Sequence, residues 1–244
     1  MLSIFSKSRQ PEKLFFETDI HCHILPGIDD GSPDVATSVS LVTKMKDMGL
    51  RRIIASPHVT YGTFENTPET VGTAKAELMA ALDAAGVDVD LQNSAEYRID
   101  DLLMSHIAQG ILMPLPGNHL LVENSFIQEP WNLDQFLFEL QLKGYVPILA
   151  HPERYAYYYG KKDRYKQMHE AGINFQINVL SLSGCYGKDE KRIAEWLIEK
   201  GYVDFVGTDL HRQSHVDSIM AYLKSKDYKR HREGLETLVK NDEI

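Results

Sequence analysis

A stretch near the start of the chain, residues 18–32, reads TDIHCHILPGIDDGS. It places His21 and His23 on either side of a cysteine and follows them with the pair Asp29 and Asp30. Because side chains alternate along an extended strand, both histidine rings point to one face. Imidazole nitrogens and carboxylate oxygens are ligands suited to Zn, Mn or Fe(II). The stretch therefore predicts part of a metal site.

Further ligand-type residues follow five other apolar runs, in the short motifs SPH, AEY, VENS, AHPER and TDLH. The candidate metal ligands are His21, His23, Asp30, His58, Glu96, Glu123, His151, Asp209 and His211. Nine ligands are too many for one ion, and carboxylates can bridge, so the set predicts two or three metals in contact. If all these side chains meet at one end of the strands, bringing so many acids together without cations would be costly, which favours bound metal ions.

Each motif also has a structural interpretation when taken alone. DDG is typical of a turn, and Glu96 and Glu123 are typical of acids paired with a neighbouring cation. Arg154 and Arg212 are candidates for binding an anionic substrate beside the metals, or for rim salt bridges. The tyrosines of the run Tyr155–Tyr159 either line the entrance or pack in the interior. The other histidines are expected to be structural or surface residues: His106, His119, His169, His215 and His231.

Short apolar runs that alternate with amphipathic helical stretches predict an α/β fold with a mostly parallel sheet. The predicted strands are Leu14–Ile20, Arg52–Ser56, Val87–Gln92, His119–Val122, Val146–Ala150, Ile173–Asn178 and Val203–Gly207. They are one fewer than in a standard eight-stranded barrel. The candidate ligands follow these strands, at the C-terminal ends that share one edge of a parallel sheet.

Capping residues predict where the helices lie between these strands. Ser32 is the expected N-cap of the first helix, with Pro33 in its first turn and Gly49 at its end. A polar helix is expected from about Val216 to Lys240.

Composition limits the class of protein. A chain of 244 residues suits one large α/β domain or two small ones, and the absence of a linker favours one. The net charge of −9 argues against a duplex nucleic-acid binder. With only Cys22 and Cys185, a reducing compartment fits, and the first residues hold no apolar run long enough for a signal or membrane span. We therefore expect a cytoplasmic protein.

The ordered motifs DIHCHILPGIDDG, SPH, AEY, HPERY and TDLH resemble those of the PHP (polymerase and histidinol phosphatase) superfamily. They are most similar to its bacterial manganese-dependent protein-tyrosine-phosphatase branch, the CpsB/YwqE type, and the resemblance covers Asp19 to about His211. It implies a distorted TIM-like (β/α)7 barrel of the PHP type. Residues 1–244 would form a single phosphatase domain, with 1–13 as a flexible N-terminus and 215–244 as a C-terminal helical segment.

The resemblance also implies a site for three divalent metal ions, with Mn²⁺ expected and Fe or Zn as alternatives. The implied ligand sets are His21, His23, Glu96 and Asp209 for one ion; Glu96, Glu123 and His151 for the next; and Asp30, His58 and His211 for the third. Glu96 would bridge two ions. Arg154 matches the family arginine that holds the phosphoryl group, and Arg212, in the segment HRQSH, stands nearest to where a second arginine is expected.

The implied activity is phosphomonoester hydrolysis through a metal-activated water. The implied substrate is a phosphotyrosine protein, the tail of a bacterial tyrosine autokinase of capsule or exopolysaccharide synthesis. A thiol mechanism needs a C-x5-R loop, but Ile28 and Lys191 stand at that offset from the two cysteines. Fold and ligands leave open a small-molecule PHP phosphatase of the histidinol-phosphate type or a PHP phosphodiesterase. A non-catalytic metal-binding regulatory module is a third alternative, against which the complete ligand set argues.

Overall fold

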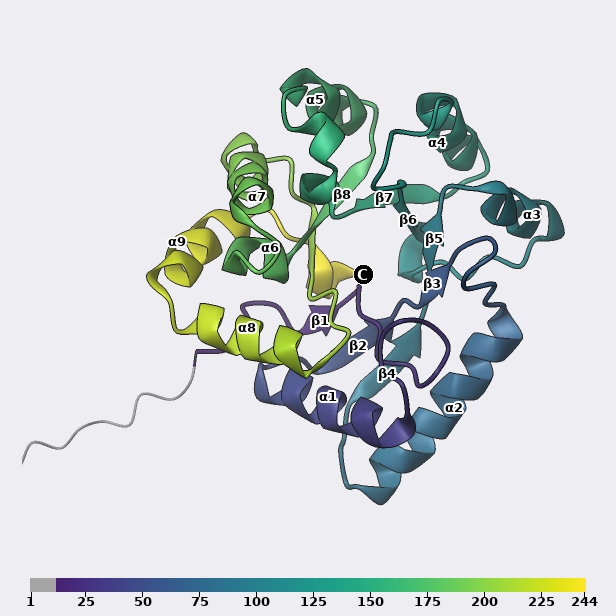
Figure 1. Ribbon diagram of the computed structural model, residues 1–244, viewed down its shortest axis with the longest axis vertical. Helices are drawn as coiled ribbons and strands as arrows, with labels where there is room; N and C mark the ends of the chain where they lie inside the picture. The colour runs from purple at the N-terminus through teal and green to yellow at the C-terminus, as the bar shows by residue number, and fades with distance from the viewer. Residues whose placement is uncertain (1–11) are drawn as a thin grey trace, which may run out of the picture.

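The computed structural model of the protein describes residues 12–244 (Figure 1). All of its strand pairings are parallel, in two sheets. The first sheet has the order β1 (Thr18–Asp19), β2 (Arg52–Ala55) and β4 (Asp90–Asn93). The second has the order β3 (His58–Val59), β5 (Glu96–Arg98), β6 (His119–Glu123), β7 (Val146–Ala150), β8 (Asn174–Asn178) and β9 (Phe205–Gly207). The predicted α/β fold with parallel strands is confirmed. Of the expected flexible N-terminus, residues 1–11 lie outside the described part.

Two short strands that were not predicted, β3 and β5, follow the second and third predicted strands after a break in each case. Residues 56–57 separate β2 from β3, and residues 94–95 separate β4 from β5. Hydrogen bonds continue beside the breaks, since Glu96 N donates to Pro57 O over 3.0 Å. Each of these two chain segments therefore contributes one strand to the first sheet and then, after the break, one strand to the second sheet.

The first and last strands of the chain are joined just beyond their C-terminal ends. Cys22 and Leu210 form a parallel bridge. Asp209 N donates to His21 O over 2.8 Å, and His23 N donates to Leu210 O over 2.9 Å. Backbone pairing thus brings together candidate ligands that lie almost 190 residues apart in the sequence.

Helices surround the strands in Figure 1, where the C-terminus lies inside the ring of strands. The helices are α1 (Val35–Asp47), α2 (Pro68–Ala84), α3 (Asp101–Gln109), α4 (Leu133–Leu142), α5 (Lys162–Glu170), α6 (Val179–Ser183), α7 (Lys188–Lys200), α8 (Gln213–Leu223) and α9 (Lys226–Leu235). Short 3-10 turns are η1 (Pro116–Asn118), η2 (Pro152–Arg154), η3 (Ala156–Tyr158) and η4 (Asn241–Glu243). No helix within residues 12–244 is both long and apolar enough to cross a membrane.

The apolar core has two parts. The larger lies where the helices pack on the outer face of the strands. The smaller consists of Ile20, Ile54, Leu115, Leu121, Ile148, Ala150 and Phe205, with Ile244 packed against it. Most of these side chains come from different strands, so the strands enclose an apolar centre.

Several predicted boundaries differ from the structure. The first strand pairs only at Thr18–Asp19, because Leu14 N instead donates to Met48 O over 2.8 Å at the end of α1. The third begins at Asp90, because Val87 N donates to Leu82 O over 2.9 Å and completes the end of α2. Leu14 and Val87 are apolar and were therefore predicted to lie in strands, but their backbone N–H groups bond to the ends of helices instead.

The predicted N-cap of the first helix was wrong by two residues. Helix α1 begins at Val35, and the carboxylate of Asp34 accepts a hydrogen bond from Thr37 N over 2.7 Å. Ser32 is buried instead, and its hydroxyl accepts from Ser38 Oγ over 2.8 Å. Pro33 accordingly precedes the helix. Serine and aspartate are both common N-cap residues, and because Ser32 is buried, Asp34 caps the helix.

The predicted C-terminal helix from Val216 to Lys240 is in fact two helices, α8 and α9. Ser225 separates them and caps α9, since its side chain accepts from Tyr228 N over 3.1 Å. A serine that satisfies the N–H groups of a new helix ends the preceding one at low cost.

Candidate metal centre

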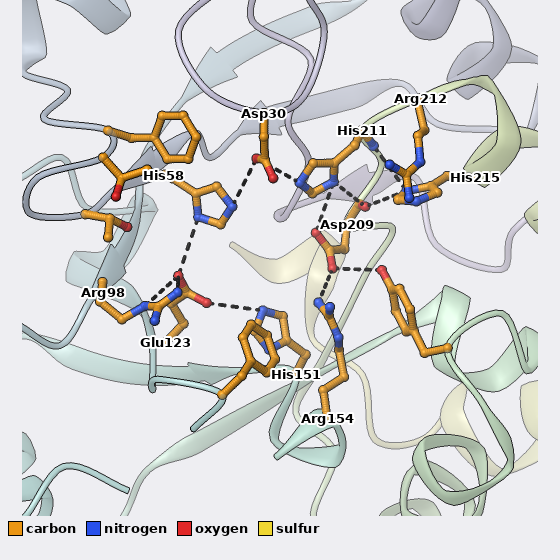
Figure 2. Close-up of a pocket in the computed structure, with 15 residues that line it drawn as sticks. Asp30, His58, Arg98, Glu123, His151, Arg154, Asp209, His211, Arg212 and His215 are labelled. Atoms are coloured by element: carbon orange, nitrogen blue, oxygen red, sulfur yellow. Dashed lines mark hydrogen bonds and ion pairs between the residues drawn. The ribbon is translucent and has the colours of Figure 1, made fainter. Parts of the chain in front are cut away.

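The structure brings all nine candidate ligands to one end of the strands, and Figure 2 labels the six of them that line the pocket there. Their ligand atoms fall into four overlapping groups, each with all atoms within 4.8 Å of one another. The groups are His23, Asp30, His58 and His211; His21, His23 and Glu96; His21, His151 and Asp209; and His58, Glu96 and Glu123. Shared members make this one continuous cluster.

Glu96, on β5, lies at the centre of the cluster and is fully buried. Its Oε2 lies 3.3 Å from His21 Nε2, 3.4 Å from His23 Nε2 and 3.0 Å from His58 Nδ1. Its Oε1 lies 2.9 Å from His151 Nε2. Two ligands that are each about 2.1 Å from one ion lie about 3.0–3.4 Å apart. The spacing around Glu96 therefore fits shared cations.

Several buried polar atoms of the cluster have no hydrogen-bond partner. They include Glu96 Oε2, Glu123 Oε2 and His58 Nδ1. An unpaired buried carboxylate oxygen costs free energy unless a cation or donor satisfies it. The donors are imidazole nitrogens and carboxylate oxygens, which suit Zn, Mn or Fe(II). The residues present thus fit divalent metal ions.

Asp30 is the most exposed of the nine and lies between two histidines, as Figure 2 shows. Its Oδ1 lies 3.4 Å from His58 Nε2 and 3.5 Å from His211 Nε2. The hydrogen bond and charge of His211, with the charge of His58, lower the pKa of Asp30 to about 2 although burial opposes the shift. This corner of the cluster opens to the pocket.

The carboxylate of Asp209 has one occupied oxygen and one that faces the cluster. Its Oδ2 accepts hydrogen bonds from Asn178 Nδ2 over 2.6 Å, Arg154 over 2.8 Å and the Tyr186 hydroxyl over 3.1 Å. Its Oδ1 lies 3.6 Å from His21 Nε2. Burial alone would raise the pKa of this carboxyl, but the neighbouring histidines and Arg154 outweigh burial and lower it. Asp209 is therefore ionised and oriented.

Two neighbouring side chains orient the first histidine pair. His21 Nδ1–H donates to Gln176 Oε1 over 2.6 Å, and His23 Nδ1–H donates to Asp29 Oδ2 over 2.8 Å. Both histidines therefore direct Nε2 at the cluster, as metal-binding histidines do when a partner fixes their tautomer. Sequence reasoning missed Gln176. Its signal was the alternation of Gln176 and Asn178 on β8, which places both on one face.

Two of the candidate ligands have a left-handed backbone. His151 has a φ of 35° and Asp209 a φ of 49°. Such conformations cost about 1–3 kcal/mol for residues other than glycine and gather at functional sites. Both are fixed by backbone bonds, since His151 N donates to Gln176 O and Asp209 N to His21 O.

Two glycines permit close approach around the first histidines. A Cβ at Gly207 would lie 2.7 Å from His21 Cβ and 2.8 Å from Gln176 Nε2. A Cβ at Gly31 would lie 2.1 Å from His23 O. Only glycine fits at either position without moving the histidine beside it.

A pocket of about 430 Å³ opens above the cluster, and three arginines line it: Arg98, Arg154 and Arg212 (Figure 2). Arg154 pairs with Asp209, and its guanidinium lies 4.1 Å from the Tyr186 ring centre and 4.8 Å from that of Phe126. Arg212 is exposed at the edge of the pocket.

Sequence reasoning missed Arg98, on β5, whose Nε donates to Glu123 Oε1 over 3.0 Å. Its position two residues after Glu96 on a strand was the available signal, because such residues share a face.

The remaining aromatic and histidine expectations have mixed outcomes. None of the tyrosines of the run Tyr155–Tyr159 is among the described residues that line the pocket, and Tyr155 and Tyr158 are buried, so their role is packing. His215, expected to be structural or on the surface, is buried and lines the pocket, where its Nδ1 lies 3.2 Å from Asp209 O.

Comparison with known proteins decides the family. The family model for capsular polysaccharide synthesis proteins, CpsB/CapC, matches residues 17–240. The chain belongs to the CpsB/CapC family. It is 33% identical over 215 residues to the tyrosine-protein phosphatase YwqE of Bacillus subtilis (strain 168), covering 86% of this chain and 84% of that protein. The family resemblance seen in the sequence is confirmed.

Two further comparisons agree with this family. It is 29% identical over 204 residues to the tyrosine-protein phosphatase CpsB of Streptococcus agalactiae serotype V, covering 79% of this chain and 82% of that protein. It also matches a crystal structure from work on YwqE from Bacillus subtilis and CpsB from Streptococcus pneumoniae, which are described as metal-dependent tyrosine phosphatases. That match has a TM-score of 0.78 and 31% identity, and covers 92% of this chain and 94% of the other.

Proposed function

We propose that this chain is a metal-dependent protein-tyrosine phosphatase. The observation that carries the proposal is Glu96, whose buried carboxylate lies among four histidines and leaves one oxygen without a hydrogen-bond partner. The cluster lies beneath a pocket lined by arginines, which suits a phosphate ester. Membership of the CpsB/CapC family and the names of its relatives support the same activity.

The proposed cofactors are three divalent metal ions, with Mn²⁺ expected and Fe or Zn as alternatives. The family resemblance assigns one ion to His21, His23, Glu96 and Asp209, the next to Glu96, Glu123 and His151, and the third to Asp30, His58 and His211. All nine residues belong to the cluster, whose four groups of nearby ligand atoms divide them differently. When bound, such ions polarise phosphoryl oxygens and lower the pKa of water. Gln176 and Asp29 would keep the Nε2 atoms of the first histidine pair available as ligands.

The protein's own contribution to substrate binding comes from the pocket. Arg154 is the proposed phosphoryl ligand, because a guanidinium offers two parallel hydrogen bonds to phosphoryl oxygens. Arg212 is a second candidate at the exposed edge. A thiol nucleophile is not proposed: Cys22 is buried, which raises the pKa of its thiol, and Cys185 is not among the described residues lining this pocket.

The finer points of fold and setting belong to the same proposal. We infer that the two sheets form one distorted TIM-like (β/α)7 barrel of the PHP type, closed by the bridge between Cys22 and Leu210, within a single domain. The proposed substrate is the phosphotyrosine tail of a bacterial tyrosine autokinase of capsule or exopolysaccharide synthesis. Two unpaired cysteines suit a cytoplasmic setting.

The test is a phosphatase assay on chelator-treated protein reloaded with Mn²⁺, Fe²⁺ or Zn²⁺. A phosphotyrosine peptide and histidinol phosphate are compared as substrates. We expect hydrolysis of the peptide only after metal is restored, and unchanged activity in the double variant C22S/C185S. Faster turnover of histidinol phosphate, or a folded but inactive double variant, would overturn the proposal.

A further inference from the structure

The segment between β6 and α4, residues 124–132, carries an unusual concentration of exposed apolar side chains. Phe126 is 42% exposed, Ile127 87% and Trp131 94%. Large apolar side chains exposed to this degree on one loop mark interaction surfaces more often than chance scatter. We call residues 124–132 the apolar loop.

The apolar loop is held firmly at its start. Asn124 N donates to the Tyr155 hydroxyl over 2.9 Å, and that hydroxyl donates to Ala150 O over 3.0 Å. The Tyr157 hydroxyl donates to Ser125 O over 3.0 Å. These bonds give the hydroxyls of Tyr155 and Tyr157 a role in anchoring the loop.

The second half of the loop is clamped by Arg164. Its NH2 donates to Glu129 Oε1 and to Asp134 Oδ1, each over 2.7 Å. These acids stand on either side of Trp131 in the sequence. The backbone is therefore fixed while the apolar side chains between the anchors point outward, so a partner would pay little entropy to order the loop.

Phe126 connects the apolar loop to the proposed active site. Its ring stacks on His151 with centres 5.6 Å apart and planes 20° apart, and the guanidinium of Arg154 lies 4.8 Å from its centre. Phe126 also lines the pocket. If Arg154 binds the phosphoryl group, the part of the substrate esterified to that phosphate lies beside the Phe126 ring. An aryl ring of the substrate can stack against Phe126 there.

We propose that the apolar loop is the polypeptide-docking element of the phosphatase. Phe126 contacts the phosphotyrosine ring, and Ile127 and Trp131 contact apolar residues that flank the phosphotyrosine. This inference rests on the proposed function and adds which part of the substrate is recognised. The exposed part of the loop is continuous with the pocket, because Ile127 directly follows Phe126, which lines the pocket. A substrate polypeptide that inserts a phosphotyrosine into the pocket would therefore pass over Ile127.

Charge distinguishes this occupant from a membrane. The apolar loop, NSFIQEPWN, contains no lysine or arginine, and its one acid is paired with Arg164. Binding to an anionic bilayer normally combines apolar insertion with basic residues. A neutral apolar surface beside an arginine-lined pocket suits a phosphorylated polypeptide better.

The test compares two peptides with one phosphotyrosine each, flanked by leucine and valine in one and by serine and glycine in the other. Hydrolysis of both, and of p-nitrophenyl phosphate, is measured for I127S and W131S in the metal-loaded protein. Affinity is measured separately by calorimetry with the same peptides carrying a non-hydrolysable phosphonate.

For each variant we expect kcat/KM on the apolar peptide to fall about tenfold relative to p-nitrophenyl phosphate, and the phosphonate Kd to rise equally, which is about 1.4 kcal/mol. The serine–glycine peptide should change less than threefold. The matched controls F138S and L142S alter side chains on α4 that are 57% and 70% exposed and lie outside the loop. They should leave all ratios within twofold.

For the ring contact, F126A should reduce kcat/KM for the apolar phosphotyrosine peptide more than for its phosphoserine counterpart. Equal losses on both, or loop variants that match the controls, would overturn the inference. So would a shift from oligomer to monomer in sedimentation of I127S or W131S, which would assign the loop to a second copy, or vesicle binding that these variants abolish. Failure of the wild-type protein to hydrolyse any of the substrates would instead reject the proposed function.

Discussion

At the scale of single residues, the cluster is organised by carboxylates whose two oxygens have different partners. Asp209 directs Oδ2 to three donors and Oδ1 to the histidines, while Glu96 has one oxygen 2.9 Å from His151 Nε2 and the other without a hydrogen-bond partner. Burial raises the pKa of both carboxyls, but the charges of the neighbouring histidines outweigh burial and lower it. The different partners of the two oxygens indicate which substitutions should affect metal binding and which should affect substrate.

Glu96→Gln should lose metal and activity with little loss of fold. A neutral amide of the same shape removes a charge shared by neighbouring ions, and we expect turnover to fall by more than about 100-fold. Metal content, circular dichroism and turnover are measured together, with Glu77→Gln on the exposed face of α2 as the control. Half the wild-type rate at full metal loading would show that Glu96 does not bridge.

Arg154 should act on substrate rather than on metal. Arg154→Lys keeps the charge but loses one of two parallel hydrogen bonds to the phosphoryl group. The lower kcat/KM for a phosphotyrosine peptide should correspond to a loss of about 1.5–3 kcal/mol of transition-state stabilisation, with metal content unchanged. Arg154→Ala should lose more. A rim salt bridge to Asp209 alone would be worth under about 1 kcal/mol, in stability rather than turnover. Unchanged kcat/KM in Arg154→Ala, measured beside its melting temperature, would remove this residue from the active site.

At the scale of elements, the sequence predicted seven of the strands and the ligand residues that follow them, because ligand motifs adjoin the apolar runs, but it did not predict the short strands β3 and β5. It did not predict the breaks at residues 56–57 and 94–95, which depend on pairing between strands. Strand β8 was predicted, but Gln176 and Asn178 were not assigned to the site, since amides carry no metal-ligand signature. The apolar periodicity of residues 216–240 likewise did not predict that Ser225 caps a new helix and divides the segment.

The junction of β9 with β1 depends on the missing side chain at Gly207. In Gly207→Ala the new methyl group would have to displace His21 or Gln176, because its Cβ would lie under 3 Å from both. We expect a lower Mn²⁺ affinity, by about tenfold or more, and a lower melting temperature. Gly72→Ala, on α2 with no atom within 4 Å of the new Cβ, is the matched control. Calorimetric Mn²⁺ titration that gives equal affinities would contradict this packing.

At the scale of the whole molecule, the C-terminal segment joins the first and last strands at the end opposite the pocket. Asn241 accepts from Val206 N over 2.9 Å and donates to Thr18 O over 2.8 Å and to Val206 O over 2.7 Å. Ile244 packs on the apolar centre. One buried amide thus joins β1 and β9 beneath the residues that hold the candidate ligands.

Asn241→Ala should destabilise the fold by about 2–4 kcal/mol, because it leaves several buried backbone groups without partners. Urea unfolding measures the loss. Asn132→Ala, at a residue whose side chain caps nothing, is the control. A loss below about 1 kcal/mol would show that this junction contributes little.

Asp204 should make stability depend on pH in the acid range. Burial raises the pKa of this carboxyl, but hydrogen bonds from His169, Lys240 and Phe175 N outweigh burial and lower it from 3.8. Because the pKa of Asp204 is lower in the folded state than in the unfolded state, the ionised carboxylate stabilises the fold at pH values above the unfolded-state pKa. That stabilisation is lost as the pH falls through the folded-state pKa. The difference in unfolding free energy between wild type and Asp204→Asn should therefore shrink below about pH 4. A constant difference between pH 7 and pH 3 would contradict this.

The nine side chains of the cluster are proposed to hold three divalent ions. The most direct test is the metal-to-protein ratio of the wild-type chain, measured by elemental analysis after loading with Mn²⁺ and removal of free ions. We predict about three ions per chain, a number set by the three proposed ligand sets within the cluster. A ratio near zero, or near one, would contradict it.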